Sequence, residues 1–127
     1  MLPARHRLRR SDDFSATVRG RGRRRAGGPL LVVHAATRPE PGDGAVRVGF
    51  VVGSTVGGAV VRNRVRRRLR ALMAQRLDGI PRGTDLVVRA VPAAAGASFA
   101  ELSTELTAHL ARVCAPATSV ASSGPAV

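Results

Sequence analysis

The sequence predicts an α+β fold, in which helices pack on a small central β-sheet to form a two-layer sandwich. Apolar runs of strand length alternate along the chain with segments whose apolar residues recur at the helical period. Clusters of glycine and proline separate these segments, and 44% hydrophobic residues in a chain of 127 are enough for one domain with a modest core. The expected order of elements is α-β-β-α-β-α.

The N-terminal region carries an arginine-rich arm over residues 1–10. The Ser-Asp pair that follows can cap a short helix with Phe14 and Val18 on one face, four residues apart. The next segment, Gly20 to Gly28, contains almost only glycine and arginine, which is typical of a solvated loop.

Two strands are expected next, at Leu30 to Ala35 and at Val46 to Val52. Between them, residues 37–44 contain two prolines and two glycines and therefore predict a turn region. Because the strands follow each other in the chain, we expect them to pair as an antiparallel hairpin with a long loop.

The pattern in the second half of the chain predicts a helix, a strand and a further helix. The helix runs from about Ala59 to Leu77, and its buried stripe is formed by Val61, Val65, Leu69 and Leu72.

A third strand follows over Asp85 to Val91, and Ser98 with Glu101 forms a capping-box pattern before the last helix. Its inward residues are expected to be Leu102, Leu106, Leu110 and Val113. We expect residues 11–114 to form a single domain and residues 115–127 to be a disordered Ala/Ser/Pro tail.

The charge of the chain favours a polyanionic partner. All 21 basic residues are arginine, against 8 acids, which gives a net charge of +13 at pH 7. An aromatic content of 2% argues against a module that stacks bases on a sheet face. The single Cys114 excludes a disulfide framework, and no apolar run approaches the length that spans a bilayer. We therefore expect a cytoplasmic protein with no membrane partner.

The segment from Arg62 to Arg70 concentrates this charge, with six arginines in nine residues and no acid between Asp43 and Asp78. At about 100° per residue, Arg62, Arg66 and Arg70 lie along one flank of the buried stripe. Arg64 and Arg68 lie along the other flank, and Arg67 points away from the core. Repulsion between like charges at i,i+4 destabilises an isolated helix, and phosphates would relieve it. Asn63 is either an exposed helix residue or a contact to RNA.

The remaining candidate residues do not form a recognisable catalytic, metal or nucleotide-binding pattern in the sequence. The loop from Gly53 to Gly58 resembles the start of a phosphate-binding loop, but the Lys and Ser/Thr that should follow are absent. His6, His34 and His109 lie on separate elements, and Glu105 is expected on the exposed side of its helix. We expect no catalytic side chain and no metal site in the protein itself.

The central block resembles a known family. Val48 to Val52, the glycine-rich turn and the run Ala59 to Arg70 are similar to the signature of the protein subunit of bacterial ribonuclease P. Further matches are the segment from His6 to Arg10 with Asp13-Phe14, and the segment from Gly83 to Ala90. The resemblance covers residues from about Leu2 to Arg112.

The resemblance implies a fold, partners and a site. The fold would include a left-handed β-α-β crossover and a further short strand around residues 21–27. The partner would be a catalytic RNA that removes the 5′ leader of precursor tRNA with Mg²⁺, which the RNA would mainly bind; no protein partner is implied. The residues that would bind this RNA are Arg62, Asn63, Arg64, Arg66, Arg67, Arg68 and Arg70. Candidates for a cleft that holds the leader are Phe14, Val18, His34 and Phe50.

The chain departs from the family pattern in ways that bear on these roles. Ser54-Thr55 stands where the family often has two lysines, and Val18 stands where a second aromatic is common. Leader contact is therefore expected to rest more on charge than on stacking. For Phe50, simple core packing is the alternative role. A structural RNA-binding protein, such as a small ribosomal protein, is the alternative function, and a non-specific DNA-binding protein would also fit the charge.

Overall fold

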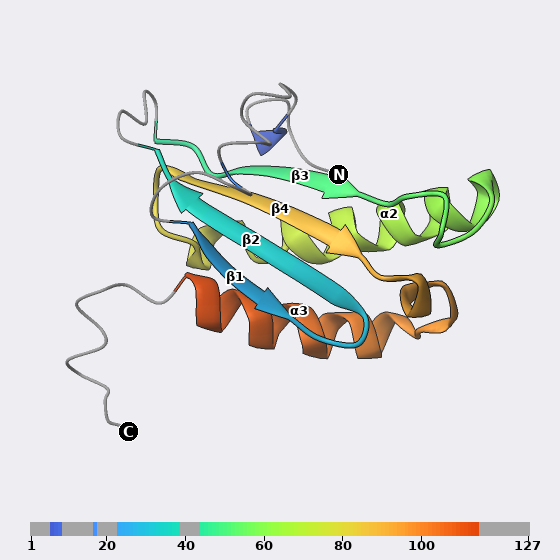
Figure 1. Cartoon of the computed structure of the whole chain (residues 1–127). Helices are drawn as coiled ribbons and strands as arrows, with labels where there is room; N and C mark the ends of the chain where they lie inside the picture. Colours follow the sequence, from blue (N-terminus) through green and yellow to red (C-terminus); the bar gives the residue numbers. More distant parts are fainter. Residues whose placement is uncertain (1–5, 9–16, 18–22, 39–43, 115–127) are drawn as a thin grey trace.

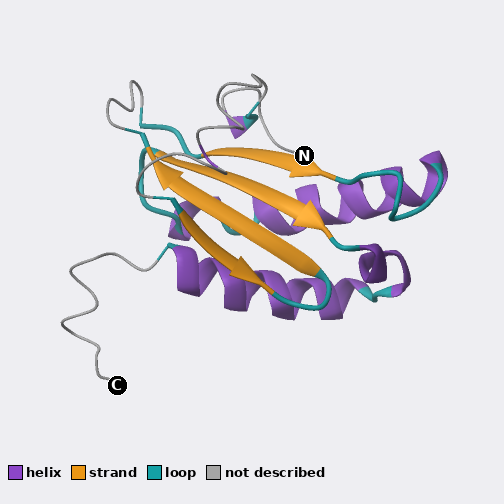
Figure 2. Cartoon of the chain, viewed as in Figure 1, coloured by secondary structure: helices purple, strands orange, loops and turns teal. Residues whose placement is uncertain are grey.

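The computed structural model describes residues 6–8, 17, 23–38 and 44–114, and Figure 1 gives the labels used below. Its strands are β1 (Arg24–Gly27), β2 (Leu31–Thr37), β3 (Arg47–Val51) and β4 (Thr84–Ala90). Its helices are α2 (Ala59–Ala74) and α3 (Phe99–Val113), with short 3-10 helices η2 (Leu77–Gly79) and η3 (Pro92–Gly96). The predicted α+β fold is confirmed (Figure 2).

The sheet has the order β1-β2-β4-β3, so the predicted hairpin between the second and third strands is wrong. Strand β4 lies between them, antiparallel to β2 and parallel to β3. All residues of β4 except Arg89 are buried, and a strand buried on both faces belongs in the interior of a sheet. The predicted loop before β2 contains the edge strand β1, which pairs with β2.

The connection from β3 through α2 to β4 is left-handed. In Figure 1 β3 and β4 point the same way, with β3 above β4 and α2 behind the sheet. Parallel strands joined through a helix adopt the right-handed form in about 98% of cases, so the residue pattern alone favours the opposite hand. The structure therefore confirms the left-handed crossover that the resemblance implies.

Both helices cover one face of the sheet, and the core lies between them and alternate strand residues (Figure 1). The helix residues buried in this core are Val65, Leu69, Leu72, Met73, Leu102, Leu106, Leu110 and Val113. The stripe predicted for the last helix is confirmed. In α2, Val61 is only half-buried. The helix ends at Ala74, earlier than the predicted Leu77, which instead begins η2.

The N-terminus of α3 is capped as the sequence predicts. The Ser98 hydroxyl oxygen accepts a hydrogen bond from the Glu101 backbone N–H at 3.0 Å. The Glu101 carboxylate in turn accepts from the Ser98 N–H at 2.8 Å. This reciprocal pair satisfies two N–H groups that have no partner within the helix.

Glu105 is not on an exposed side, and that prediction is wrong. Its carboxylate accepts hydrogen bonds from the backbone N–H groups of Leu30 and Leu31, the latter at 2.7 Å, and contacts His109 Nε2 at 3.0 Å. A Cβ at Gly28 would lie 2.8 Å from this carboxylate, so the glycine permits the close approach. Glu105 thereby fastens the start of β2 to α3.

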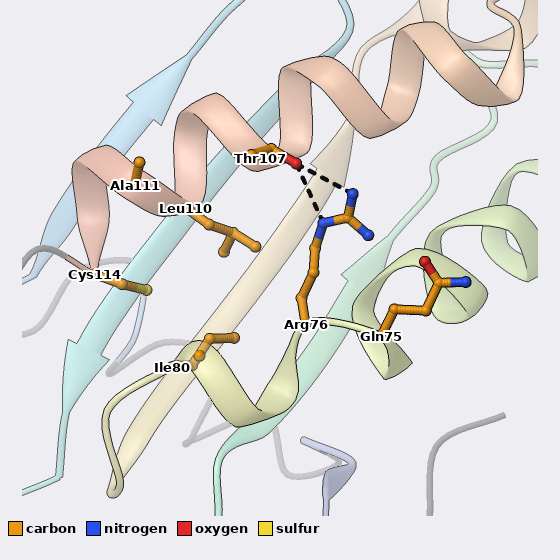
Figure 3. Close-up of a pocket in the computed structure, with 8 residues that line it drawn as sticks. Gln75, Arg76, Ile80, Thr107, Leu110, Ala111 and Cys114 are labelled. Carbon is orange, nitrogen blue, oxygen red and sulfur yellow. Dashed lines mark hydrogen bonds between the residues drawn. The ribbon is translucent and has the colours of Figure 1, made fainter.

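Arg76 connects the end of α2 to α3, as Figure 3 shows. Its guanidinium donates to the Leu72 carbonyl at 2.8 Å and to the hydroxyl oxygens of Ser103 and Thr107, at 2.7 Å and 3.1 Å. Arg76 and Thr107 line a cavity of about 440 Å³ that extends to Cys114. All the hydrogen bonds go to neutral acceptors, so the positive charge of Arg76 is retained.

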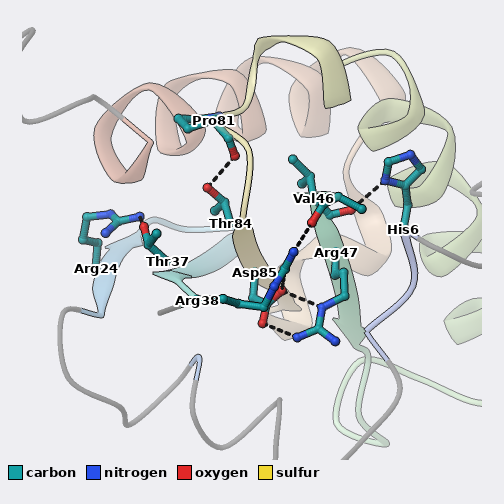
Figure 4. Close-up of polar contacts among 10 residues, drawn as sticks. His6, Arg24, Thr37, Arg38, Val46, Arg47, Pro81, Thr84 and Asp85 are labelled. Atoms are coloured by element: carbon teal, nitrogen blue, oxygen red, sulfur yellow. Dashed lines mark hydrogen bonds and ion pairs between the residues drawn. The ribbon is translucent and has the colours of Figure 1, made fainter. Parts of the chain in front are cut away.

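The other face of the sheet carries a buried ionic cluster centred on Asp85, shown in Figure 4. Asp85 is 5% exposed, and its carboxylate accepts from Arg47 Nε at 2.8 Å and from Arg47 Nη2 at 2.7 Å. Arg38 donates to the same carboxylate and, through Nη2, to the Ala45 carbonyl at 2.5 Å. One acid on β4 thus holds β3 and the end of β2 together.

His34 lies on the same face of the sheet as Asp85, away from the helices. It is 6% exposed, and its Nδ1 has no hydrogen-bond partner. Burial, followed by the nearby charges of Arg25, Arg89 and Arg23, lowers the pKa of His34 below its ordinary value of 6.5. His34 is therefore held in its neutral form.

The predicted first helix lies almost wholly outside the described residues, including Phe14 and Val18. Thr17 alone is described there, and it is helical and buried. The predicted tail at 115–127 is likewise outside the described part. Among the described residues, no helix has both the length and the apolar character needed to cross a membrane.

We predict that Asp85→Ala lowers the free energy of unfolding by about 3–5 kcal/mol, because it removes the buried carboxylate that two half-buried arginines share. Urea denaturation followed by circular dichroism measures the change. Asp78→Ala is the control, since Asp78 is exposed on η2, and it should change stability by less than about 0.5 kcal/mol. Equal effects of the two substitutions would contradict the assigned role of Asp85.

We predict that His34 makes the fold less stable in weak acid. Its pKa is lowered in the folded state, so the unfolded chain binds the proton more readily. The stability contributed by neutral His34 is complete above pH 6.5 and is lost as the pH falls from there toward the folded-state pKa. Urea denaturation at pH 7.5 and 5.5 should show a larger loss for the wild type than for His34→Gln. Parallel losses would refute the prediction.

Candidate nucleic-acid interface

The arginines of α2 form no ion pair with any residue in the described part of the chain. Asp85 is occupied by Arg38 and Arg47, and Glu105 by the start of β2 and His109. The helix also has no acid in its first turn, and its N-cap residue, Gly58, supplies no side-chain hydrogen bond. Among the described residues, the charge of the α2 arginines is therefore uncompensated, and the helix presents it for an external anion.

One flank of this helix is tied to the rest of the protein. Arg64 Nη2 donates to the Ala95 carbonyl at 3.2 Å, and Arg68 Nη1 donates to the Ala97 carbonyl at 3.0 Å. These contacts join α2 to η3 and orient both guanidinium groups. Because the acceptors are neutral carbonyls, both arginines keep their charge and their remaining donors.

The outward side of α2 lines a cavity of about 580 Å³. Its lining residues are Arg7, Asn63, Arg66, Arg67, Arg70 and Ala71. Asn63 Oδ1 accepts a hydrogen bond from Arg66 Nη1 at 3.2 Å, so the exposed asparagine orients a neighbouring guanidinium. The predicted grouping of Arg66 with Arg70 is confirmed, whereas Arg62 does not line this cavity and its buried Nε has no partner.

Arg7 is the member of this site that the sequence analysis did not predict. The backbone N–H of Leu8 donates to the Val48 carbonyl at 2.9 Å, which attaches the N-terminal arm to the outer edge of β3. This attachment brings Arg7 beside α2, more than fifty residues away in the chain. The arginine-rich composition of the arm indicated anion binding, but no local pattern could show where the arm lies.

The two described candidates for the leader cleft, His34 and Phe50, lie on opposite faces of the sheet. Phe50 pairs with Val88 and packs against the core on the helix-covered face, which favours the core-packing alternative. His34 pairs with Val87 on the opposite face, where Arg25 and Arg89 are exposed. A single leader cleft therefore cannot use both His34 and Phe50.

The described residues do not bring a catalytic group together. His6 bonds the Val46 carbonyl, whereas His34 stands on β2. His109 contacts the Glu105 carboxylate, and this contact fastens α3 to the sheet. No three His, Cys, Asp or Glu side chains in the described ranges lie close enough to hold a metal ion. In the Gly53–Gly58 loop, Val56 N–H donates to the Gly53 carbonyl at 3.0 Å, which is an ordinary turn.

Solved structures of known proteins share this fold. At the level of the fold, the chain is similar to the ribonuclease P protein of Staphylococcus aureus, with a TM-score of 0.75, 22% identity and coverage of 86% of this chain and 97% of that one. The ribonuclease P protein of Thermotoga maritima gives a TM-score of 0.67 at 24% identity and covers 80% of this chain and 92% of that one.

Similarity in sequence is stronger. The ribonuclease P protein component of Acidothermus cellulolyticus is 56% identical over 117 residues, which cover 89% of this chain and 92% of the relative. That of Streptomyces bikiniensis is 55% identical over 119 residues, covering 89% and 95%. The sequence pattern that defines the ribonuclease P family matches residues 2–114. With this match over most of its length, the chain belongs to the family of ribonuclease P protein components.

Proposed function

We propose that this protein binds the catalytic RNA of ribonuclease P through the outward side of α2 and helps that RNA to remove the 5′ leader from precursor tRNA. The observation that carries the proposal is the set of α2 arginines that have no ion-pair partner among the described residues. An RNA backbone supplies phosphates at regular spacing, and arginine binds phosphate with two parallel hydrogen bonds. Membership of the family supports the role as a subunit of the ribonucleoprotein.

We further propose that the face of the sheet opposite the helices holds the single-stranded leader. The exposed Arg25 and Arg89 flank the half-buried Val32 and the buried His34 on this face. Phe14 and Val18, which lie outside the described residues, are proposed as further contacts on the basis of the resemblance. With few aromatic residues available, attraction to the leader phosphates is the main contribution.

The cleavage chemistry is assigned to the RNA partner, together with most of the Mg²⁺. The described side chains do not form a group that would hold this ion, and we assign none to the protein. Under this proposal the protein contributes affinity, orientation and charge neutralisation, and the subunits act together as an endoribonuclease.

Reconstitution tests the proposal directly. At a low Mg²⁺ concentration that leaves the catalytic RNA of ribonuclease P nearly inactive alone, the protein should restore site-specific cleavage of precursor tRNA. The arginines of α2 would then neutralise part of the phosphate charge that Mg²⁺ otherwise neutralises. An arginine-rich peptide of equal charge serves as the control. If the peptide restored cleavage as well as the protein does, or if the protein restored none, the proposed function would be wrong.

Arg67→Ala should weaken binding to the catalytic RNA and reduce the slope of log affinity against log salt by about 0.7–0.9, because one phosphate contact is lost. Arg112→Ala is the matched control, since Arg112 is exposed near the end of α3 and does not line the α2 cavity. Filter binding across a series of KCl concentrations measures both slopes. The assignment fails if the two variants give the same slope.

Arg89→Ala should reduce the preference for precursor over mature tRNA by about two- to fivefold, the size of an exposed ionic contact. The affinity of the protein for the catalytic RNA should not change. Phe14→Ala should also reduce this preference, but without changing the salt dependence of subunit binding. Binding of both tRNAs to the reconstituted complex provides the measurement. If Arg89→Ala instead weakened binding to the catalytic RNA and left the preference for precursor tRNA unchanged, Arg89 would contact the catalytic RNA and not the leader.

A further inference from the structure

We propose that a single-stranded segment of the catalytic RNA binds along the seam between α2 and α3, and that Arg76 and Phe99 contact it there. The residues of this seam are Arg64, Arg68 and Arg76 on one side and Phe99, Ser103, Thr107 and Ala111 on the other. The inference rests on the proposed function, since it extends the RNA-binding surface beyond the outward side of α2.

One flank of α3 forms the first side of the seam. Phe99, Ser103, Thr107 and Ala111 follow one another at intervals of four residues, so they lie along the same flank of the helix. Arg76 Nη2 donates to the hydroxyl oxygens of Ser103 and Thr107, at 2.7 Å and 3.1 Å, which places this flank against the end of α2. In Figure 3 the Arg76 side chain extends toward Thr107.

The second side of the seam is a row of three arginines that contact successive points of η3 and α3. Arg64 donates to the carbonyl before the end of η3 and Arg68 to the carbonyl after it, while Arg76 reaches the hydroxyl groups of α3. At a rise of about 1.5 Å per residue, the row extends for about 18 Å from Arg64 to Arg76. Separated cations of this kind suit a chain of phosphates rather than one small anion.

The charge of this row is available to a partner. All the hydrogen-bond acceptors of Arg64, Arg68 and Arg76 are neutral, and none of the three forms an ion pair within the described part of the chain. Asp78, the acid nearest to Arg76 in the sequence, is exposed on η2 and does not line the adjoining cavity. The residues that follow Cys114, 115–127, contain no acidic side chain.

The two ends of the seam favour unpaired nucleotides. Phe99, at the start of α3, is 43% exposed and offers an aromatic surface on which a base can stack. At the other end, Ile80, Leu110 and Ala111 give the cavity beside Arg76 an apolar wall. Its volume of about 440 Å³ is typical of small-ligand sites and admits one base. Bases paired within a duplex could use neither feature, so the seam suits a single strand.

The first test measures the affinity of the full-length protein for the catalytic RNA of ribonuclease P across a KCl series. Arg76→Gln should reduce the slope of log affinity against log salt by about 0.7, because one phosphate contact is lost. Arg76→Lys keeps the charge and should keep the slope. Arg112→Ala is the control and should also have the slope of the wild type.

The melting temperature of each variant separates RNA binding from a merely structural role of Arg76. If Arg76 only ties α2 to α3, both of its variants should melt at a lower temperature and both should keep the slope of the wild type. That result would overturn the inference. Thr107→Val removes one acceptor of Arg76 but no charge, so it should leave the slope unchanged.

The second test addresses the bases. Phe99→Ala should weaken binding by about fivefold or more without changing the salt slope, since a stacking contact carries no charge. Ala111→Leu narrows the cavity and should weaken binding in the same way. Ala108→Leu is its matched control, because Ala108 is also exposed on α3 but does not line this cavity. If Phe99→Ala bound like the wild type, or Ala111→Leu like Ala108→Leu, the seam would not hold unpaired bases and the inference would be wrong.

The outcomes separate this inference from the proposed function. If the seam variants bound the RNA like the wild type while Arg67→Ala weakened binding, the outward side of α2 would bind the RNA without the seam. If Arg67→Ala also had no effect, the proposed function itself would fail.

Discussion

The electrostatic repulsion among the arginines of α2 is the constraint on which the rest of the structure depends. The sequence of this helix opposes its own folding, because like charges stand four residues apart and no acid relieves them. Packing provides the compensation: Val65, Leu69 and Leu72 are fully buried against the sheet. The apolar stripe therefore sets the position of the helix and directs its charge outward. A helix held in this way is preorganised for an anion, since its arginines are gathered before the partner arrives.

Two acids of the described part, Asp85 and Glu105, hold elements of the fold together rather than neutralising α2. Asp85 joins the strands on the face away from the helices, and Glu105 joins α3 to the start of β2. Each of these carboxylates accepts hydrogen bonds from several donors at once, and hydrogen bonds to a charged acceptor are stronger than those between neutral groups. Arg64 and Arg68 use neutral carbonyls of η3 and the residue after it, which orients them without removing their charge. Stability and binding are thus supplied by different groups.

Much of the fold could be predicted from local pattern. The periodicity of α2 and α3, the capping box at Ser98 and the buried strand around Leu86 all depend on residues close together in the chain, and they are confirmed. The pairing of β2 with β3 was predicted wrongly, because adjacency in sequence is only a weak guide to adjacency in a sheet. Strand β1 has no apolar alternation and is a strand because β2 offers it an edge. The role of Glu105 depends on the start of β2, 74 residues away.

The sequence by itself determined that the arginines from 62 to 70 occupy the solvent side and flanks of one helix, because the helical period is a local property of the backbone. Only the tertiary structure decided which of them remain open to a partner. Carbonyls of the segment around η3 take one flank, and the arm attached to β3 brings Arg7 to the other side of the helix. The tertiary structure also placed Phe50 against the core and His34 on the opposite face of the sheet. These outcomes depend on contacts between residues some thirty to sixty positions apart, for which no local spacing carries a signal.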